Sequence, residues 1–208
     1  GRTMNATPYL TPQQIIDRFS ARFGNGLTEA KVTERGEGTR KVKAYNLWFR
    51  IDREQLRPAI EELIAIRFPH LAVIAGNDLG TDIELLYIFS VFYGQKFGEY
   101  MVTIAIRLPK SDLTVPTITD LIPGALFSER EKQEFFGITV TGIPDGRRLF
   151  LPEDFPKGVY PWRKDETGIP PEMIKNLWEV DRPKDRPVPP IPEKAPAPEG
   201  KKEGGESP

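Results

Sequence analysis

Three glutamates, Glu129, Glu131 and Glu134, are the residues of this chain that come nearest to a catalytic arrangement. Glu131 and Glu134 lie three positions apart, so a helix would place both carboxylates on one face, as in some general acid and base pairs. A local role competes with this one, because Ser128 is predicted to cap a helix and Glu131 completes its capping box. Since the stretch 128–165 contains no Cys, no His and no substrate motif, we favour the structural interpretation and expect no catalytic site.

The same stretch concentrates basic side chains that suit ion pairing. Arg130, the pair Arg147-Arg148 and the cluster Arg163-Lys164-Asp165 offer groups that bind carboxylates of a neighbouring chain or loop, the arginines in bidentate fashion. Tryptophans in such an extended region are typical anchors of protein interfaces. The predicted partner-binding residues are Glu129, Arg130, Glu131, Arg147, Arg148, Trp162, Arg163, Lys164, Asp165 and Trp178.

Composition excludes several classes of function. The chain has 208 residues with 29 basic and 30 acidic side chains, a balance that provides no basic field for nucleic acid. It has no cysteine and one histidine, His70, so disulfides, thiol nucleophiles, iron–sulfur ligation and a zinc site are not expected. Its apolar runs are shorter than the roughly 20 residues that span a bilayer. We expect a soluble, cytosolic protein without cofactor-binding or metal-binding residues, and without a secretory signal.

Hydrophobic periodicity predicts the elements that must position the charged stretch. Helices are expected from Thr11, in a capping box with Gln14, to Gly24, from Asp52 to before Pro69, around 118–122, and from Ser128 to Gly137. Strands are expected over 45–51, 71–75, 83–92 and 100–108, the last two as a hairpin. This order predicts an α+β fold, with a mixed or antiparallel sheet of about four strands packed with helices.

Three parts are expected along the chain: an α+β core domain (1–110), a charged docking segment with short helices (111–165) and an extended proline-rich C-terminal arm (166–208). From Pro183 the sequence is almost entirely proline and charge, which cannot bury a core and is typical of disorder or polyproline II. We interpret the arm as a segment that lies along a partner. A loose linker and an SH3-type ligand are the alternatives.

With these residues identified, the chain resembles the thirty-kilodalton subunit family of respiratory complex I. That family includes the matching subunits of membrane-bound NiFe hydrogenases and related ferredoxin-linked complexes. The resemblance is carried by Pro116-Thr117-Ile118-Thr119, Pro123-Gly124-Ala125, Glu129-Arg130-Glu131, Gly137-Ile138, Gly142, Pro144-Asp145, Arg147-Arg148, Gly158, Pro161 and Arg163-Lys164-Asp165.

Departures from the complex I pattern select a branch of the family. Ile143 stands where complex I members usually carry His before Pro144, Trp162 where they carry Leu, Glu134 where they carry Asp, and Gly146 where they carry Leu. The missing His favours the hydrogenase-like branch over the quinone-reducing one.

The resemblance implies a non-catalytic structural subunit in the peripheral arm of a membrane-bound, ferredoxin-linked respiratory complex of the hydrogenase type. It would dock on a NiFe-hydrogenase-like large subunit, near a small iron–sulfur subunit. Iron–sulfur clusters and a NiFe site would belong to those partners and no cofactor to this chain. The chain would lie at the cytoplasmic face of the membrane, as a peripheral subunit held by its partners. The alternative within the family is the thirty-kilodalton subunit of quinone-reducing NADH dehydrogenase. The alternatives outside the family are a free-standing enzyme that uses carboxylates as acid and base, and a proline-rich adaptor.

Overall fold

The computed structural model describes residues 9–39, 42–94 and 98–174. The chain divides into a compact unit, Gly1–Met173, and a second unit, Ile174–Pro208. Most of the predicted proline-rich arm, including Trp178, therefore lies outside the described residues. The helices are α1 (Pro12–Phe23), α2 (Leu56–Ile66) and α3 (Ala125–Phe136). The strands are β1 (Leu27–Glu37), β2 (Val42–Ile51), β3 (His70–Asp78), β4 (Asp82–Val91), β5 (Tyr100–Pro109), β6 (Thr114–Pro116) and β7 (Thr139–Thr141).

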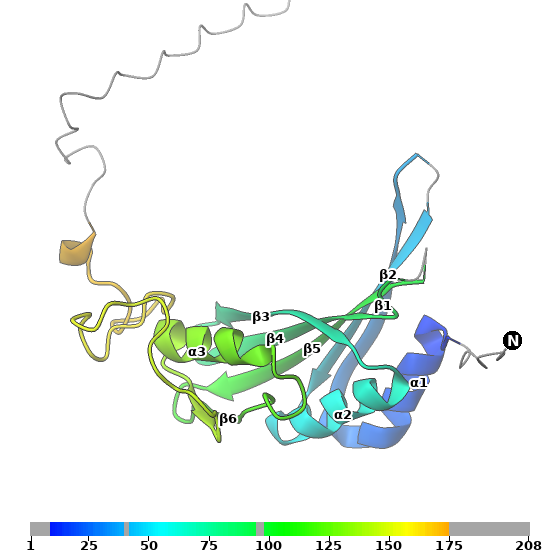
Figure 1. The fold of residues 1–208 in the computed structure, drawn as a ribbon, viewed down its shortest axis with the longest axis horizontal. Helices are drawn as coiled ribbons and strands as arrows, with labels where there is room; N and C mark the ends of the chain where they lie inside the picture. The colour runs from blue at the N-terminus through cyan, green and yellow to red at the C-terminus, as the bar shows by residue number, and fades with distance from the viewer. Residues whose placement is uncertain (1–8, 40–41, 95–97, 175–208) are drawn as a thin grey trace, which may run out of the picture. The chain divides into compact units, whose positions relative to one another are not determined.

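Five strands form one mixed sheet in the order β1-β2-β5-β4-β3 (Figure 1). β2 and β5 run parallel, with Phe49 opposite Ile104, whereas the other neighbours are antiparallel. The predicted α+β class and mixed sheet are confirmed, with one more strand than expected. The additional strand is β1, whose sequence LTEAKVTERGE is too polar to show a hydrophobic period. A separate parallel pair joins β6 to β7.

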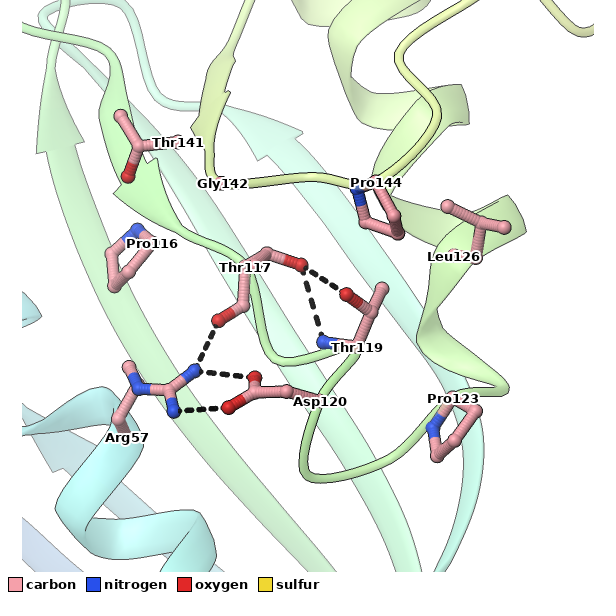
Figure 2. A pocket seen from close by; sticks show the side chains of 10 residues that line it. All are labelled: Arg57, Pro116, Thr117, Thr119, Asp120, Pro123, Leu126, Thr141, Gly142 and Pro144. Atoms are coloured by element: carbon pink, nitrogen blue, oxygen red, sulfur yellow. Dashed lines mark hydrogen bonds and ion pairs between the residues drawn. The ribbon is translucent and has the colours of Figure 1, made fainter.

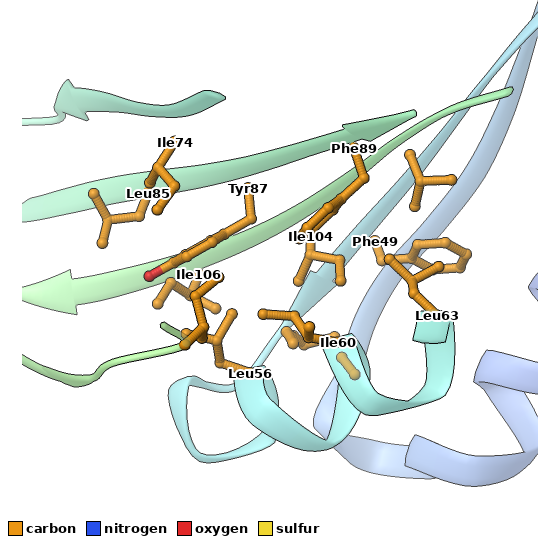
Figure 3. Close-up of a cluster of buried hydrophobic side chains, with 14 of the residues drawn as sticks. Phe49, Leu56, Ile60, Leu63, Ile74, Leu85, Tyr87, Phe89, Ile104 and Ile106 are labelled. Atoms are coloured by element: carbon orange, nitrogen blue, oxygen red, sulfur yellow. The ribbon is translucent and has the colours of Figure 1, made fainter. Parts of the chain in front are cut away.

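The core lies between the sheet and the helices α1 and α2. Leu47 and Phe49 of β2 alternate with more exposed neighbours and are 1% and 0% exposed, as the predicted period requires. Figure 3 shows Leu56, Ile60 and Leu63 of α2 among the inward side chains of the strands. The inward residues of β5 are Val102, Ile104, Ile106 and Leu108. Because burying one Leu or Ile side chain contributes roughly 1.5–3 kcal/mol, this inner face supplies much of the stability of the fold.

The ends of the helices follow the predicted caps in part. Thr11 accepts the Gln14 N–H at 3.2 Å and donates its own N–H to the Gln14 side chain at 2.8 Å, which confirms the first capping box. The predicted cap at Ser128 is wrong, because α3 already begins at Ala125 after a hydrogen-bonded turn. Ala125 is fully buried, and its packing starts the helix about one turn before Ser128, where a side-chain cap was predicted. Gly137 ends α3 in the left-handed conformation (φ 68°), as predicted.

The helix predicted from Asp52 is present as α2 but begins later than expected. Asp52 precedes a short 3-10 turn, Arg53–Gln55, and makes no capping bond with its side chain, so the predicted cap is wrong. The other predicted helical segment is only a turn. The segment 118–122 is closed by bonds from two N–H groups to the Ile118 carbonyl and goes no further, because Pro123 follows.

α3 packs at the β3 side of the sheet. A Cβ on Gly76 of β3 would come within 2.4 Å of the Phe136 ring, so only glycine allows helix and strand to approach this closely. The arrangement places the start of α3 beside β6 and β7 and its end over β3 (Figure 1). In the part of the chain that the structure describes, no helix is both long enough and apolar enough to cross a membrane.

Candidate docking surface

Helix α3 turns charged side chains toward the protein interior. Glu129, Arg130, Lys132 and Glu134 are between 2% and 8% exposed. A charge removed from water is costly unless partners replace the lost hydration. Each of these side chains finds partners within the chain, and most of the partners lie in the segments on either side of the helix.

Glu134 anchors the loop after α3 through the loop's backbone. Its Oε2 accepts the N–H groups of Phe150 at 2.9 Å and Leu151 at 3.0 Å, and its Oε1 accepts that of Leu149. Successive amides directed at one carboxylate form an anion-binding nest, and bonds to a charged acceptor are stronger than neutral ones. The Glu134 carboxylate therefore holds three residues of the loop in place.

Arg130 donates hydrogen bonds to two backbone carbonyls of the same loop. Its Nε donates to the Arg147 carbonyl at 2.7 Å and its Nη2 to the Arg148 carbonyl at 2.8 Å. Arg148 in turn donates to two carbonyls further along, at 2.7 and 3.2 Å. The Arg147 side chain is 85% exposed and pairs with Asp145 at 2.8 Å. The guanidinium groups of Arg130 and Arg148 therefore fix the course of the loop.

Glu129 fixes the segment that precedes the helix. Its Oε2 accepts the Thr117 hydroxyl at 2.6 Å, and its Oε1 accepts the N–H of Ile118 at 2.7 Å. Burial raises the pKa of the Glu129 carboxyl, because desolvation disfavours its charged form more than these two bonds favour it.

A second anchor joins the end of the loop to the sheet. The buried Asp78 carboxylate, on β3, accepts the Lys164 N–H at 2.8 Å and the Lys110 ammonium at 3.0 Å. Lys110 also pairs with Asp165 at 2.5 Å, and the Lys164 ammonium binds the Asp78 carbonyl at 3.0 Å. The Lys110 ammonium, with hydrogen bonds from Thr167, holds the pKa of Asp165 well below its usual range. The charged cluster at 163–165 is thus tied to the strand through two of its members.

Arg163 and Trp162 fasten the loop to the end of α3. Arg163 Nε donates to the Phe136 carbonyl at 2.7 Å, and its guanidinium lies 4.5 Å from the Tyr160 ring centroid. The backbone N–H of Trp162 donates to the Phe135 carbonyl at 3.1 Å, and the rings of the two residues stack with their centroids 4.4 Å apart.

The anchored loop and α3 leave the side chains of Phe127, Phe150 and Trp162 exposed, with exposed fractions of 60%, 59% and 42%. We call Phe150 and Trp162 the aromatic patch, because both contact the ring of Phe135. Phe150 and Trp162 both pack on the ring of Phe135, at 5.8 and 4.4 Å between centroids. Exposed aromatic side chains held on a rigid base are typical of protein interfaces.

A pocket of about 680 Å³ opens beside the first turn of α3 (Figure 2). Apolar groups of Pro123, Leu126 and Pro144 line one part of it. On its other side Arg57 of α2 makes two parallel hydrogen bonds to Asp120, at 2.7 and 2.8 Å (Figure 2). Arg57 lowers the pKa of Asp120 to about 2, so the carboxylate stays charged. The pocket therefore combines an apolar wall with a compensated ion pair.

The predicted partner-binding residues that the structure describes all have partners inside the chain. They are Glu129, Arg130, Glu131, Arg147, Arg148, Trp162, Arg163, Lys164 and Asp165. Arg147, Arg148, Trp162 and Lys164 are also exposed to solvent. Trp178 lies outside the described residues. Among the described residues, no group of His, Cys, Asp and Glu is placed to hold a metal ion.

Several contributors were not predicted. Phe127 and Phe150 are large apolar residues in charged or proline-containing surroundings, a signal that sequence inspection can use. Arg57 and Lys132 gave no such signal. Lys132 is 3% exposed beneath Trp162, with its ammonium 4.7 Å from the ring centroid, and burial lowers its pKa.

The sequence matches a family model described as "Respiratory-chain NADH dehydrogenase, 30 Kd subunit" over residues 49–172. Membrane-bound hydrogenase subunit beta of Pyrococcus furiosus is 32% identical over 165 residues, which cover 79% of this chain and 91% of that protein. NADH-quinone oxidoreductase subunit 5 of Thermus thermophilus is 34% identical over 139 residues, 62% of this chain and 66% of that one. Formate hydrogenlyase subunit 5 of Escherichia coli is 35% identical over 98 residues, 46% of this chain but 17% of that one.

The fold is also found in a solved complex. A chain in the structure of the membrane-bound sulfane sulfur reductase (MBS), an archaeal respiratory membrane complex, superposes with a TM-score of 0.60 at 24% identity, covering 85% of this chain and 96% of that one. The family match runs from β2 to the end of the anchored loop and so includes every anchor on α3. The resemblance drawn from residues 116–165 is confirmed. The chain belongs to the family of the 30 Kd subunit of respiratory-chain NADH dehydrogenase, and its relatives fit the hydrogenase-like branch.

Proposed function

We propose that this chain is a non-catalytic structural subunit of a membrane-bound, ferredoxin-linked respiratory complex of the hydrogenase type. It docks on a hydrogenase-like large subunit beside a small iron–sulfur subunit, at the cytoplasmic face of the membrane. The iron–sulfur clusters, and a NiFe site, belong to those partners. The observation that carries the proposal is the construction of α3, whose buried charges hold a loop that presents aromatic side chains to solvent.

The carboxylates that resembled an acid and base pair are already engaged. Glu134 accepts three backbone N–H groups, and Glu131 pairs with the Lys132 ammonium. A general acid or base must lie within hydrogen-bond reach of the proton that it transfers. Since both groups are directed at protein atoms, their arrangement supports an anchoring role.

A rigid surface binds a partner with less loss of conformational freedom than a mobile one. Ordering one rotamer-rich side chain at an interface costs about 0.5–1.5 kcal/mol. The loop that carries Phe150 and Trp162 is ordered by Glu134, Arg130 and Arg163 within the free chain. The side chains of the aromatic patch are therefore ordered when the chain folds, and binding a partner requires little further loss of their conformational entropy.

The relatives support permanent association with a larger protein. In formate hydrogenlyase subunit 5, the segment similar to this chain makes up 17% of the protein, so most of that polypeptide is other sequence. A domain covalently joined to a larger chain is held beside it at high effective concentration. We infer that the separate chain makes an equally lasting contact through its surface.

The alternative is a subunit of a quinone-reducing NADH dehydrogenase, for which the Thermus thermophilus relative is the model. Two observations favour the hydrogenase type. The hydrogenase relative matches over a larger share of both chains, and Ile143 occupies the position where the complex I pattern has His.

Assembly of the complex in the native membrane tests the proposal. A tagged chain carrying Phe127→Ala and Phe150→Ala should recover far less large subunit, because truncating an interface hot spot costs about 2 kcal/mol or more, close to 30-fold in affinity. Tyr9→Ala removes a 40% exposed aromatic elsewhere in the fold and is the control. Hydrogen production per assembled complex should stay at the wild-type level. Normal recovery of the double variant, or normal assembly with loss of turnover, would contradict the proposal.

A further inference from the structure

Glu129 of α3 is a buried carboxyl whose hydrogen bonds come from neutral donors. It is 2% exposed, and within the residues that the structure describes it makes no ion pair. Arg57 of α2 favours its ionised form, but Arg57 is paired with Asp120 at 2.7 Å, and Asp120 disfavours that form. The remaining titratable group that senses its charge is Tyr87 of β4. A buried acid in such surroundings takes up a proton more readily than an exposed one.

The hydrogen bonds of Glu129 continue to the wall of the pocket beside α3 through two hydroxyl groups. Its Oε2 accepts the hydroxyl of Thr117 at 2.6 Å, and the Oγ1 atoms of Thr117 and Thr119 lie 2.9 Å apart (Figure 2). Thr119 is partly exposed and lines the pocket. Because a hydroxyl group donates one hydrogen bond and can accept two, either threonine can be the donor within this pair.

The charge of Glu129 decides which threonine donates. An ionised carboxyl holds no proton, so Thr117 donates to Oε2, and its own oxygen accepts the hydroxyl and the N–H of Thr119, at 2.9 and 3.1 Å. In the protonated carboxyl the proton belongs on Oε2, because Oε1 accepts the N–H of Ile118 at 2.7 Å. The acid O–H then donates to the Thr117 oxygen, and the Thr117 hydroxyl donates to Thr119.

We propose that Glu129, Thr117 and Thr119 form a hydroxyl relay, which couples the protonation of a buried acid to the hydrogen-bonding character of the pocket wall. With Glu129 ionised, the Thr119 hydroxyl points to Thr117 and turns oxygen lone pairs toward the pocket. With Glu129 protonated, the same hydroxyl donates its hydrogen into the pocket. Proton uptake therefore changes a wall that suits N–H donors into one that suits carbonyl or carboxylate acceptors. The relay belongs to this chain alone and goes beyond the proposed docking function.

The neighbouring groups titrate outside the pH range in which the relay should respond. The hydrogen bonds of Arg57 lower the pKa of Asp120 to about 2, and burial raises the pKa of Tyr87. Desolvation raises the pKa of Glu129 above the ordinary value of 4.5, against the two hydrogen bonds that the carboxyl accepts. A change at Thr119 between about pH 8 and pH 4 therefore reports the charge of Glu129.

An NMR titration of the full chain over this pH range tests the relay. The carboxyl carbon of Glu129 and the backbone amide of Thr119 should shift together, with one midpoint above 4.5. Glu129→Gln should remove the shift at Thr119, because the amide group does not titrate. A midpoint at or below 4.5 in the wild-type chain would overturn the proposal, and so would a titrating Glu129 beside an unchanging Thr119 amide.

Two valine variants separate the relay from the proximity of the charge. Thr117→Val interrupts the relay, so the shift at Thr119 should lose most of its amplitude. The Glu129 midpoint should rise by about one pH unit, because a hydrogen bond to a charged acceptor is about twice as strong as a neutral one. Thr141→Val is the matched control, since its hydroxyl lines the same pocket but donates to the Val115 carbonyl, at 3.4 Å, and it should change neither shift. A full shift at Thr119 in Thr117→Val would mean that the amide senses the charge through space, and the relay would be rejected.

Discussion

Replacing Glu134 by glutamine should release the loop that carries Phe150. The carboxylate accepts three backbone N–H groups. A bond to a charged acceptor contributes about 1.5–3 kcal/mol and a neutral one about 0.5–1.5 kcal/mol. The amide oxygen of Gln can keep two of the bonds in weakened form, but its NH₂ group faces the third N–H and cannot accept it. We therefore expect a loss of roughly 3–4 kcal/mol in the free energy of anchoring.

Two measurements check this value. Urea unfolding followed by circular dichroism should show a lower free energy of unfolding, and the melting temperature should fall by about 10 °C if the loop unfolds with the core. If the loop detaches alone, hydrogen exchange should instead accelerate at Leu149, Phe150 and Leu151 while the sheet stays protected. Glu166→Gln is the control, since Glu166 is exposed and has no ion pair in the described part of the chain.

The reasoning fails if Glu134→Gln changes neither quantity. A loss below about 0.5 kcal/mol, within the range of ordinary surface substitutions, together with unchanged exchange at the three amides, would mean that the carboxylate does not hold the loop. Phe150 would then have to be ordered by its contact with Phe135 and by the hydrogen bonds of Arg130 and Arg148.

Further substitutions test the packing and the buried charge. The pKa of Glu129 is raised in the folded state, so the free energy of unfolding should increase as pH falls through that pKa toward the ordinary value of 4.5. Glu129→Gln should remove this increase, which urea titrations at pH 7 and pH 5 would measure. Gly137→Ala and Gly158→Ala both place alanine at positive φ, 68° and 80°, at a cost of about 1–2 kcal/mol. Only Gly137→Ala also meets the Tyr160 ring, at 2.4 Å, so calorimetry should show the lower melting temperature for it. Gly76→Ala should cost about 1–3 kcal/mol by overpacking against α3, and an unchanged melting temperature would contradict the close packing described.

The elements that sequence patterns predicted are those with one apolar face. β2 and β5 alternate regularly because one face of each strand lies on the core, and Leu47 and Phe49 show this period. β1 pairs along its length with β2 but has few apolar residues, so no hydrophobic period marks it. The start of α3 was misplaced because burial of Ala125, a small and unremarkable residue in sequence, begins that helix.

For the candidate docking surface, the types of the residues were predictable and their partners were not. Arg130 and Glu134 bind backbone carbonyl and N–H groups, which every residue possesses and no sequence pattern marks. Asp78 meets Lys164 across 86 positions, a contact that exists only because β3 ends where the loop returns. Ion-pairing side chains in a proline-containing stretch indicate anchoring, but the choice between a neighbouring loop and a neighbouring protein requires the fold.

The parallel pairing of β2 with β5 bears on how the chain reaches its native state. β1 with β2, and β3 with β4 and β5, are antiparallel neighbours in sequence order, so each group can form soon after its residues leave the ribosome. Tyr45 and Tyr100 are opposite each other only once the whole stretch between them has been made. Until then one edge of β2 has no paired strand. Closing the loop between Tyr45 and Tyr100 costs conformational entropy before the hydrogen bonds between β2 and β5 can form. Synthesis that stalls before Tyr100 would leave β2 and β4 both unpaired on one side, and that intermediate would be the one most exposed to aggregation.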